Sequence, residues 1–115
     1  MTDPELWGAG CVWYGGGALR AQGKVLPPPT ERLARIAAPV AGFFGNDDKN
    51  PSPADVNLFD ERLSALGKPH EFHRYDGAGH AFMNRWGEKY REAACEDSWT
   101  RGLAFLRRHL VPVLA

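Results

Sequence analysis

The feature that most constrains the fold is an apolar run, Val40–Gly45, which the carboxylate pair Asp47 and Asp48 follows closely. A run of four to eight apolar residues bounded by turn residues is typical of a strand buried on both faces. Such strands belong to parallel sheets that helices cover. The run therefore predicts a buried parallel strand, with Asp48 just past its carboxyl end.

A helix with clear end signals follows this strand. Ser52 suits the N-cap, Pro53 suits the first helical position, and Asp55 completes a capping-box pattern. Gly67 and Pro69 predict where the helix stops. One apolar face recurs at spacings of three and four residues, and it consists of Val56, Phe59, Leu63 and Leu66.

The segment from His70 to Tyr75 predicts a short strand that is more polar than the first, as an edge strand is. Strand, helix and strand then make one βαβ unit, and the crossovers of such units are almost always right-handed. Both strands end at the same edge of the sheet. That edge is where open α/β sheets bind their ligands.

A histidine set among small residues follows the second strand, in the sequence Tyr75-Asp76-Gly77-Ala78-Gly79-His80. Gly77 and Gly79 permit positive φ and a sharp turn, which predicts that His80 stands out at a loop tip. Its imidazole can exchange protons near neutral pH. Taken alone, this stretch also fits a surface turn that happens to hold a histidine.

The βαβ unit predicts that Asp48 and His80 lie on neighbouring loops. An aspartate that accepts a hydrogen bond from one imidazole nitrogen selects the tautomer and stabilises the imidazolium. That arrangement is the orienting part of a nucleophile, base and acid triad.

Two further elements frame this unit. Small and apolar residues bounded by glycines predict a buried strand over Gly10 to Tyr14. A final helix is predicted from about Glu92 to Leu110, with an apolar stripe that faces the sheet. The stripe consists of Cys95, Trp99, Leu103, Leu106 and Leu110. Residues 18 to 30 predict a loop, and Glu31 to Ala37 predict a turn or two of helix.

The composition narrows the class of protein. A chain of 115 residues has room for one domain and one core. Fourteen basic residues balance fourteen acidic ones, which argues against a nucleic-acid partner. We expect a cytoplasmic protein, because the sequence has neither a membrane-spanning run nor a signal peptide. Cys11 and Cys95 form no metal motif and fit free thiols, and no cofactor is indicated.

The order strand, strand, helix, strand, helix predicts an α/β fold with about three parallel strands flanked by helices. An acid one crossover before a histidine is the order of the α/β-hydrolase triad, in which the nucleophile comes first. Its nucleophile elbow has the form Gly-x-Ser/Cys-x-Gly. Cys11 is the tempting candidate, but Trp13 stands where the elbow needs a small residue, which favours a packed strand cysteine.

Two other candidates and the available length also argue against a nucleophile in this sequence. Cys95 falls within the helical stripe, and Ser52 is occupied as a cap. Nine residues precede Gly10, whereas an elbow, its helix and the next strand need roughly 25.

The residues resemble those of the dienelactone hydrolase family, specifically its carboxyl-terminal half. Gly10 to Gly16 looks like the family strand that follows the nucleophile helix, and Ala38 to Asp48 resembles its acid strand. Tyr75 to Phe82 resembles the histidine loop, and Glu96 to Leu110 is similar to the final helix. The match covers most of the chain.

This resemblance implies that residues 1–115 form a single domain with a partial α/β-hydrolase fold. It implies hydrolysis of an ester or lactone through an acyl intermediate, with Asp48 as the triad acid and His80 as the general base. The family's nucleophile, usually a cysteine, has no counterpart here, nor has the backbone amide after it that forms part of the oxyanion hole. Family members that bind a dienelactone carboxylate use an arginine shortly after the histidine, where this chain has Asn84 and then Arg85.

Three hypotheses follow. The first is a hydrolase that a nucleophile-bearing half completes. The second is an inactive fragment that serves as a binding or assembly module, with a homodimer or complex formed through the apolar edge of Gly10 to Tyr14. The third, with weaker support, is a metal-assisted hydrolase built on Asp47, Asp48 and His80. His70 and His73 lie at odd spacing on one strand, so they should face opposite ways and not share a metal.

Overall fold

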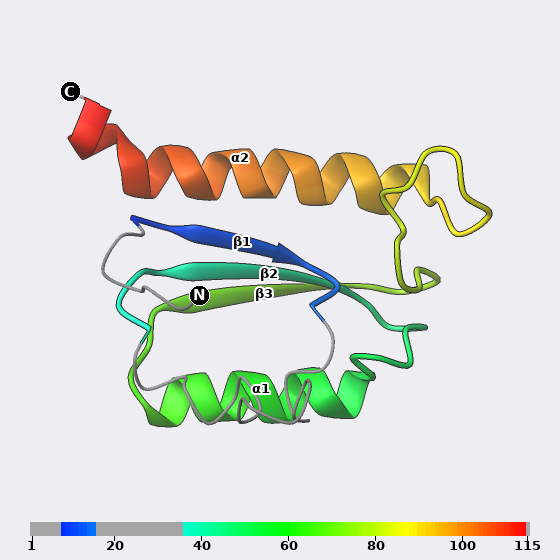
Figure 1. Cartoon of the computed structure of the whole chain (residues 1–115), viewed down its shortest axis with the longest axis horizontal. Helices are drawn as coiled ribbons and strands as arrows, with labels where there is room; N and C mark the ends of the chain where they lie inside the picture. Colours follow the sequence, from blue (N-terminus) through cyan, green and yellow to red (C-terminus); the bar gives the residue numbers. More distant parts are fainter. Residues whose placement is uncertain (1–7, 16–35, 115) are drawn as a thin grey trace, which may run out of the picture.

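A computed structural model describes residues 8–15 and 36–114. Its elements are β1 (Gly10–Trp13), β2 (Val40–Gly45), α1 (Pro53–Ala65), β3 (His70–Tyr75) and α2 (Glu92–Leu114). The three strands form a parallel sheet in the order β1-β2-β3, with α2 along one face and α1 along the other (Figure 1). The predicted α/β architecture is confirmed. The loop predicted over residues 18 to 30 and most of the turn predicted over Glu31 to Ala37 lie outside the described residues.

The apolar run forms the middle strand of this sheet, as predicted. All six residues of β2 are buried. The strand pairs with β1 from Gly10 opposite Val40, and with β3 along its whole length until Gly45 meets Tyr75. Because β2 and β3 end together, the segments that follow them begin side by side at one edge of the sheet.

Aromatic side chains fill the space on both faces of the sheet. Toward α2, Trp13 stacks on Phe43 with ring centroids 4.8 Å apart, and His73 stacks on the same phenylalanine at 5.4 Å. On the other face, Phe72 of β3 meets Phe59 of α1 at 5.4 Å. This division gives the central strand a core on each side and explains its continuous apolar sequence.

The two histidines of β3 lie on opposite faces, as their odd spacing predicts. His70 shares the α1 face with Phe72 and pairs with Asp60, whereas His73 stacks on Phe43 below α2. They cannot meet at one metal ion.

The predicted cap of α1 is confirmed. The Ser52 hydroxyl accepts a hydrogen bond from the Asp55 amide at 3.2 Å, and the Asp55 carboxylate accepts one from the Ser52 amide at 3.1 Å. Gly67 has a φ of 67° just past the helix, which is the left-handed conformation that ends many helices. The placement of Leu66 on the buried face was wrong, because it lies beyond the last helical residue and is 45% exposed.

The predicted stripe of α2 was also partly wrong. Cys95 is buried, but Trp99 is 52% exposed. The helix instead turns Ser98 and Gly102 toward the sheet, where the indole of Trp13 donates a hydrogen bond to the Ser98 hydroxyl at 3.1 Å. A β-carbon at Gly102 would lie 3.0 Å from that indole. Small residues on α2 therefore receive the large side chain of β1, and Trp99 lies to the side.

Candidate active site

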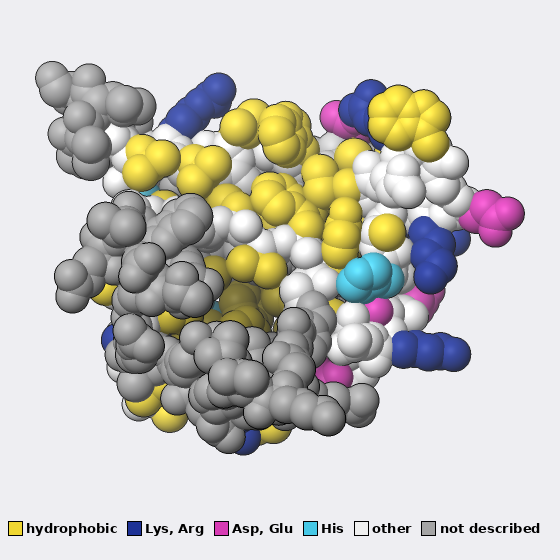
Figure 2. All heavy atoms as spheres, in the orientation of Figure 1, with side chains coloured by type: hydrophobic (Ala, Val, Ile, Leu, Met, Phe, Trp, Pro, Cys, Tyr) yellow, Lys and Arg dark blue, Asp and Glu magenta, His cyan; other side chains and the backbone are white. Residues whose placement is uncertain are grey.

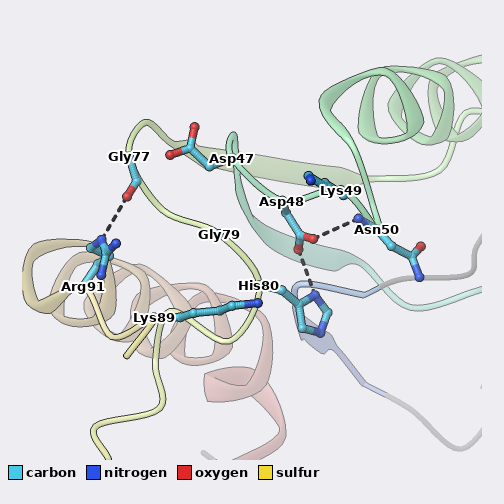
Figure 3. Close-up of a pocket in the computed structure, with 9 residues that line it drawn as sticks. All are labelled: Asp47, Asp48, Lys49, Asn50, Gly77, Gly79, His80, Lys89 and Arg91. Atoms are coloured by element: carbon cyan, nitrogen blue, oxygen red, sulfur yellow. Dashed lines mark hydrogen bonds and ion pairs between the residues drawn. The ribbon is translucent and has the colours of Figure 1, made fainter. Parts of the chain in front are cut away.

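Asp48 lies where the sequence predicts, three residues past the end of β2. Its side chain is only 4% exposed. One carboxylate oxygen accepts a hydrogen bond from the Asn50 amide at 2.9 Å, and the other lies 2.9 Å from Nδ1 of His80 (Figure 3). Hydrogen bonds therefore fix both oxygens of this buried carboxylate, one to the backbone that follows Asp48 and one to the histidine.

His80 is much more open than its partner, with a side chain that is 47% exposed. Because a carboxylate is a hydrogen-bond acceptor, the ring nitrogen that faces it carries the proton. The other nitrogen, Nε2, is then the one that can take up a proton from a reacting group. The predicted juxtaposition of Asp48 and His80 is present in the structure.

The histidine loop lies directly across the end of β2. The Asn46 amide donates to the Tyr75 carbonyl at 2.9 Å, and the Asp47 amide donates to the Ala78 carbonyl at 2.9 Å. A β-carbon at Gly45 would lie 2.6 Å from the carbonyl carbon of Ala78, which is closer than real β-carbons come. Glycine at position 45 therefore permits the contact that places His80 beside Asp48. The sequence marked this glycine only as the end of a strand.

The backbone of the loop turns differently from the prediction. Gly77 has a positive φ of 73°, as expected, but Gly79 does not, so the expectation for that residue was wrong. The second left-handed residue is Ala81, with a φ of 63°. Ala78 and Phe82, on either side of the histidine, are both buried. His80 therefore stands on a short segment that is anchored at both ends.

Arg91, which the sequence analysis did not single out, links the two ends of this region. Its Nε donates to the Gly77 carbonyl at 3.1 Å, and its Nη1 donates to the carbonyls of Glu88 at 3.2 Å and Tyr90 at 2.9 Å. Its own amide donates to the Phe82 carbonyl at 3.0 Å. A guanidinium suits this role because it presents several donors in a fixed plane. No sequence pattern indicates it.

An open pocket of about 560 Å³ lies beside the acid and histidine pair. It is lined by Asp47, Asp48, Lys49, Asn50, Gly77, Gly79, His80, Lys89 and Arg91. In Figure 3 the Lys89 side chain extends along the pocket toward His80, and the Asp47 carboxylate points away from the pair. Across residues 8–15 and 36–114, no three His, Cys, Asp or Glu side chains gather in a group that could hold a metal ion.

The cysteine and serine side chains between the sheet and α2 make hydrogen bonds to the backbone of α2. The Cys11 thiol donates to the Gly102 carbonyl at 3.8 Å, and burial, with a smaller contribution from the Glu71 carboxylate, raises its pKa. Ser98 is fully buried and donates to the Cys95 carbonyl at 3.1 Å. Cys11 is thus a packed thiol of the interface between β1 and α2.

Comparison with known proteins identifies the family of the chain. A model of the dienelactone hydrolase family matches residues 2–110. The chain belongs to this family. A "putative carboxymethylenebutenolidase" of Saccharolobus solfataricus is 39% identical over 85 residues, which are 71% of this chain and 32% of that protein. A protein of the same name from Methylorubrum extorquens is 33% identical over 103 residues, 88% of this chain and 35% of that protein.

A solved structure shares the fold. A "putative dienelactone hydrolase" from Klebsiella pneumoniae superposes with a TM-score of 0.74 at 29% identity, over 84% of this chain and 40% of that one. The three-stranded parallel sheet with its two helices is therefore part of an α/β-hydrolase fold. The chain spans about a third of the length of the two curated relatives described above. Neither α1 nor α2 is long and apolar enough to cross a membrane.

Proposed function

We propose that this chain provides the acid and the base of a hydrolase that acts on an ester or a lactone. Asp48 is the acid and His80 the general base. The observation that carries the proposal is the 2.9 Å contact between His80 Nδ1 and the buried carboxylate of Asp48. A carboxylate held in this way keeps the imidazole in one tautomer and stabilises its protonated form.

The chemistry has two halves. In the first, Nε2 of His80 takes the proton of a nucleophilic thiol or hydroxyl, which attacks the carbonyl carbon and forms a tetrahedral intermediate. The histidine then returns the proton to the leaving oxygen, and an acyl intermediate remains. In the second half, His80 removes a proton from water, and the water oxygen attacks the carbonyl carbon of the acyl intermediate. The bond between that carbon and the nucleophile breaks, the carboxylic acid leaves, and the histidine returns the proton to the nucleophile. In a lactone the leaving alcohol stays attached to the acyl group.

The nucleophile, by this proposal, comes from outside these 115 residues. No Gly-x-Ser/Cys-x-Gly sequence is present in the chain. Cys11 makes a poor substitute, because its thiol is packed against Gly102 and burial raises its pKa. The backbone amide that follows the nucleophile, one donor of the oxyanion hole, comes with it.

The geometry of the sheet favours one way to bring that nucleophile to His80. In the described part of the chain, β1 pairs with β2 alone, so its outer edge can accept another strand. A strand added in parallel ends at the same edge as β2 and β3, where His80 lies. A second copy of β1 related by a two-fold axis perpendicular to the sheet would run antiparallel to the first. The loops at the carboxyl ends of its strands would then lie at the opposite edge of the sheet from His80. A complementing half therefore completes the site, whereas such a homodimer does not.

Hydrolysis of p-nitrophenyl acetate tests the proposal. The 115-residue chain alone should give no rate above buffer. Mixed or co-expressed with the part of the Saccharolobus relative that this chain does not match, it should give a rate that His80→Ala abolishes and Cys11→Ala leaves unchanged. If the chain alone hydrolyses the ester and Cys11→Ala removes that activity, Cys11 is the nucleophile and the proposal is wrong.

The second candidate function is that of an inactive binding or assembly module. Two observations favour it. The outer edge of β1 has no partner within the described residues, and the nearby Trp99 is 52% exposed. Figure 2 shows hydrophobic side chains gathered along α2 and over the sheet beside it. Such a surface favours a homodimer through Gly10 to Tyr14. Light scattering that shows a stable monomer at high concentration would exclude this homodimer and argue against an assembly role for the edge.

A further inference from the structure

Two residues with an unfavourable backbone conformation both adjoin His80. Within residues 8–15 and 36–114, the non-glycine residues with positive φ are Tyr14, at 40°, and Ala81, at 63°. A residue with a β-carbon adopts this left-handed region only when its surroundings hold it there, and such residues gather at functional sites. Ala81 follows His80 in the chain. Tyr14 is far from His80 in sequence, yet its ring lies 5.0 Å from the imidazole between centroids.

The backbone of Tyr14 explains how its ring reaches the histidine. Its amide still bonds to the sheet, donating to the Phe43 carbonyl at 2.8 Å. In a continuing strand the side chain after Trp13 would point to the opposite face, away from α2. The positive φ breaks this alternation at the carboxyl end of β1. The tyrosine ring instead lies at the sheet edge, where the histidine loop passes.

A buried phenylalanine supports the tyrosine in that position. The Tyr14 ring packs edge-on against Phe82 at 5.5 Å with an interplanar angle of 76°, and Phe82 is fully buried. Against His80 the Tyr14 ring is tilted by 56°. Both arrangements are ones that aromatic rings favour. A residue anchored in the core thus braces the ring that contacts the imidazole.

The orientation of the His80 ring depends on a contact besides its hydrogen bond to Asp48. Its side chain is 47% exposed. Among the described residues, Asp48 alone forms a hydrogen bond with the ring, at Nδ1. A single hydrogen bond fixes one atom and leaves the plane of the ring free to swing about it. A neighbouring ring limits that rotation and so sets the direction in which Nε2 points.

We propose that Tyr14 is a positioning residue for His80. Its ring keeps the imidazole in the plane that holds Nδ1 on Asp48 and turns Nε2 toward the proton to be transferred. The proposal rests on the proposed role of His80 as the base. It assigns no chemistry to the Tyr14 hydroxyl, so phenylalanine should serve as well.

Nuclear magnetic resonance of the 115-residue chain tests the proposal through the His80 ring. Tyr14→Phe keeps the ring, whereas Tyr14→Asn removes it and places at this position a residue that tolerates positive φ. We expect the phenylalanine variant to retain one imidazole tautomer, with a protected Nδ1 proton signal. In the asparagine variant the melting temperature should be retained, while that signal broadens and both tautomers appear. A wild-type imidazole spectrum in the asparagine variant would overturn the proposal.

The unmodified chain supplies a test that does not depend on whether a variant folds. Cross-relaxation between the ring protons of Tyr14 and those of His80 is expected at this separation, and its absence would overturn the proposal. These signals report on ring geometry whether or not any ester is cut, so failure of the proposed hydrolase function leaves them unchanged. In a completed enzyme, Tyr14→Asn should lower kcat and leave KM nearly unchanged, and Tyr14→Phe should restore kcat.

Discussion

Gly45 at the end of β2 lies against the carbonyl group of Ala78, on the loop that carries His80. A β-carbon at position 45 would approach the carbonyl carbon to 2.6 Å. The Asp47 amide bonds to the same carbonyl at 2.9 Å. The loop is therefore held against the end of β2 at one peptide group, and its distance from the sheet sets the distance from His80 to Asp48.

Gly45→Ala should displace this loop and destabilise the fold. The atoms that the new β-carbon would meet belong to the backbone of Ala78 and Gly79, and none is the flexible end of a side chain. The cost expected for forcing extra atoms into a packed site is about 1–3 kcal/mol in the free energy of unfolding. Chemical denaturation measures that cost, and amide shifts from Ala78 to His80 report the displacement.

Gly79→Ala is the matched control. Its β-carbon would meet nothing closer than the Asp47 carbonyl oxygen at 3.9 Å, which is an ordinary contact, and Gly79 has no positive φ. This variant should keep the stability and the loop shifts of the original chain. Equal effects of the two substitutions would show that the contact at Gly45 does not position the loop.

Asp48→Asn should disable the base without unfolding the chain. Asparagine has nearly the same size, but its amide no longer selects the tautomer of His80 or stabilises the imidazolium. In a hydrolase completed by a nucleophile-bearing half, we expect a fall in kcat of about 10⁴-fold, as in other triads of this kind. Asp47→Asn is the control, because the neighbouring carboxylate points away from the pair (Figure 3). A comparable fall in both variants would argue against a specific role for Asp48.

The sequence predicts the sheet and the acid and histidine pair because these depend on local patterns. A six-residue apolar run, a capped helix and a following polar strand identify a βαβ unit, and the topology of that unit brings Asp48 and His80 to one edge. Each step uses periodicity or end signals that can be read within a few residues.

The parts that the sequence does not predict depend on packing between distant segments. The orientation of α2 follows from the fit of the Trp13 indole over Gly102, so the exposed Trp99 could not be distinguished from a core residue by its spacing. The three carbonyl contacts of Arg91 likewise depend on how the loop folds back. A left-handed Tyr14 has no local signal at all, because positive φ is rare for tyrosine.

Tyr75→Phe should raise the pKa of Asp97. The Tyr75 hydroxyl donates to the Asp97 carboxylate at 2.8 Å, and this hydrogen bond, with a smaller contribution from Arg101, lowers the pKa of Asp97 from its usual 3.8. A lowered carboxyl pKa stabilises the fold above its unfolded-state pKa, and that stability disappears as pH falls through the lower folded-state value. The variant should therefore be less stable than the original chain near neutral pH, and the difference should shrink below about pH 4.

Carbon-detected titration of the Asp97 carboxyl measures this shift directly. Tyr90→Phe is the control, because no hydrogen bond from the Tyr90 hydroxyl to a described residue is present. An Asp97 titration curve that is the same with and without the Tyr75 hydroxyl would contradict the prediction.

Arg91→Ala should loosen the histidine loop. The substitution removes three hydrogen bonds to backbone carbonyls and keeps the bond from the backbone amide of Arg91. If their net contribution is about 1 kcal/mol, the amide of Asp47, which bonds to the Ala78 carbonyl, should exchange with solvent about fivefold faster. Arg91→Lys should recover only part of the protection, since an ammonium cannot reach several carbonyls in one plane. Arg85→Ala, in the same loop, removes only a 3.4 Å contact to Glu96 and should leave the exchange unchanged.

The Cys11 thiol should react slowly with alkylating reagents. Burial raises its pKa, the Glu71 carboxylate adds to that effect, and only the thiolate attacks the reagent. Iodoacetamide at pH 8, followed by peptide mass spectrometry to separate Cys11 from Cys95, should label Cys11 far more slowly in the folded chain than in the denatured one. Glu71→Gln should increase the rate in the folded chain, because it removes the nearby negative charge. Fast labelling of Cys11 in the folded chain would mean that this thiol is accessible and ionised, and Cys11 would then be a candidate nucleophile for His80.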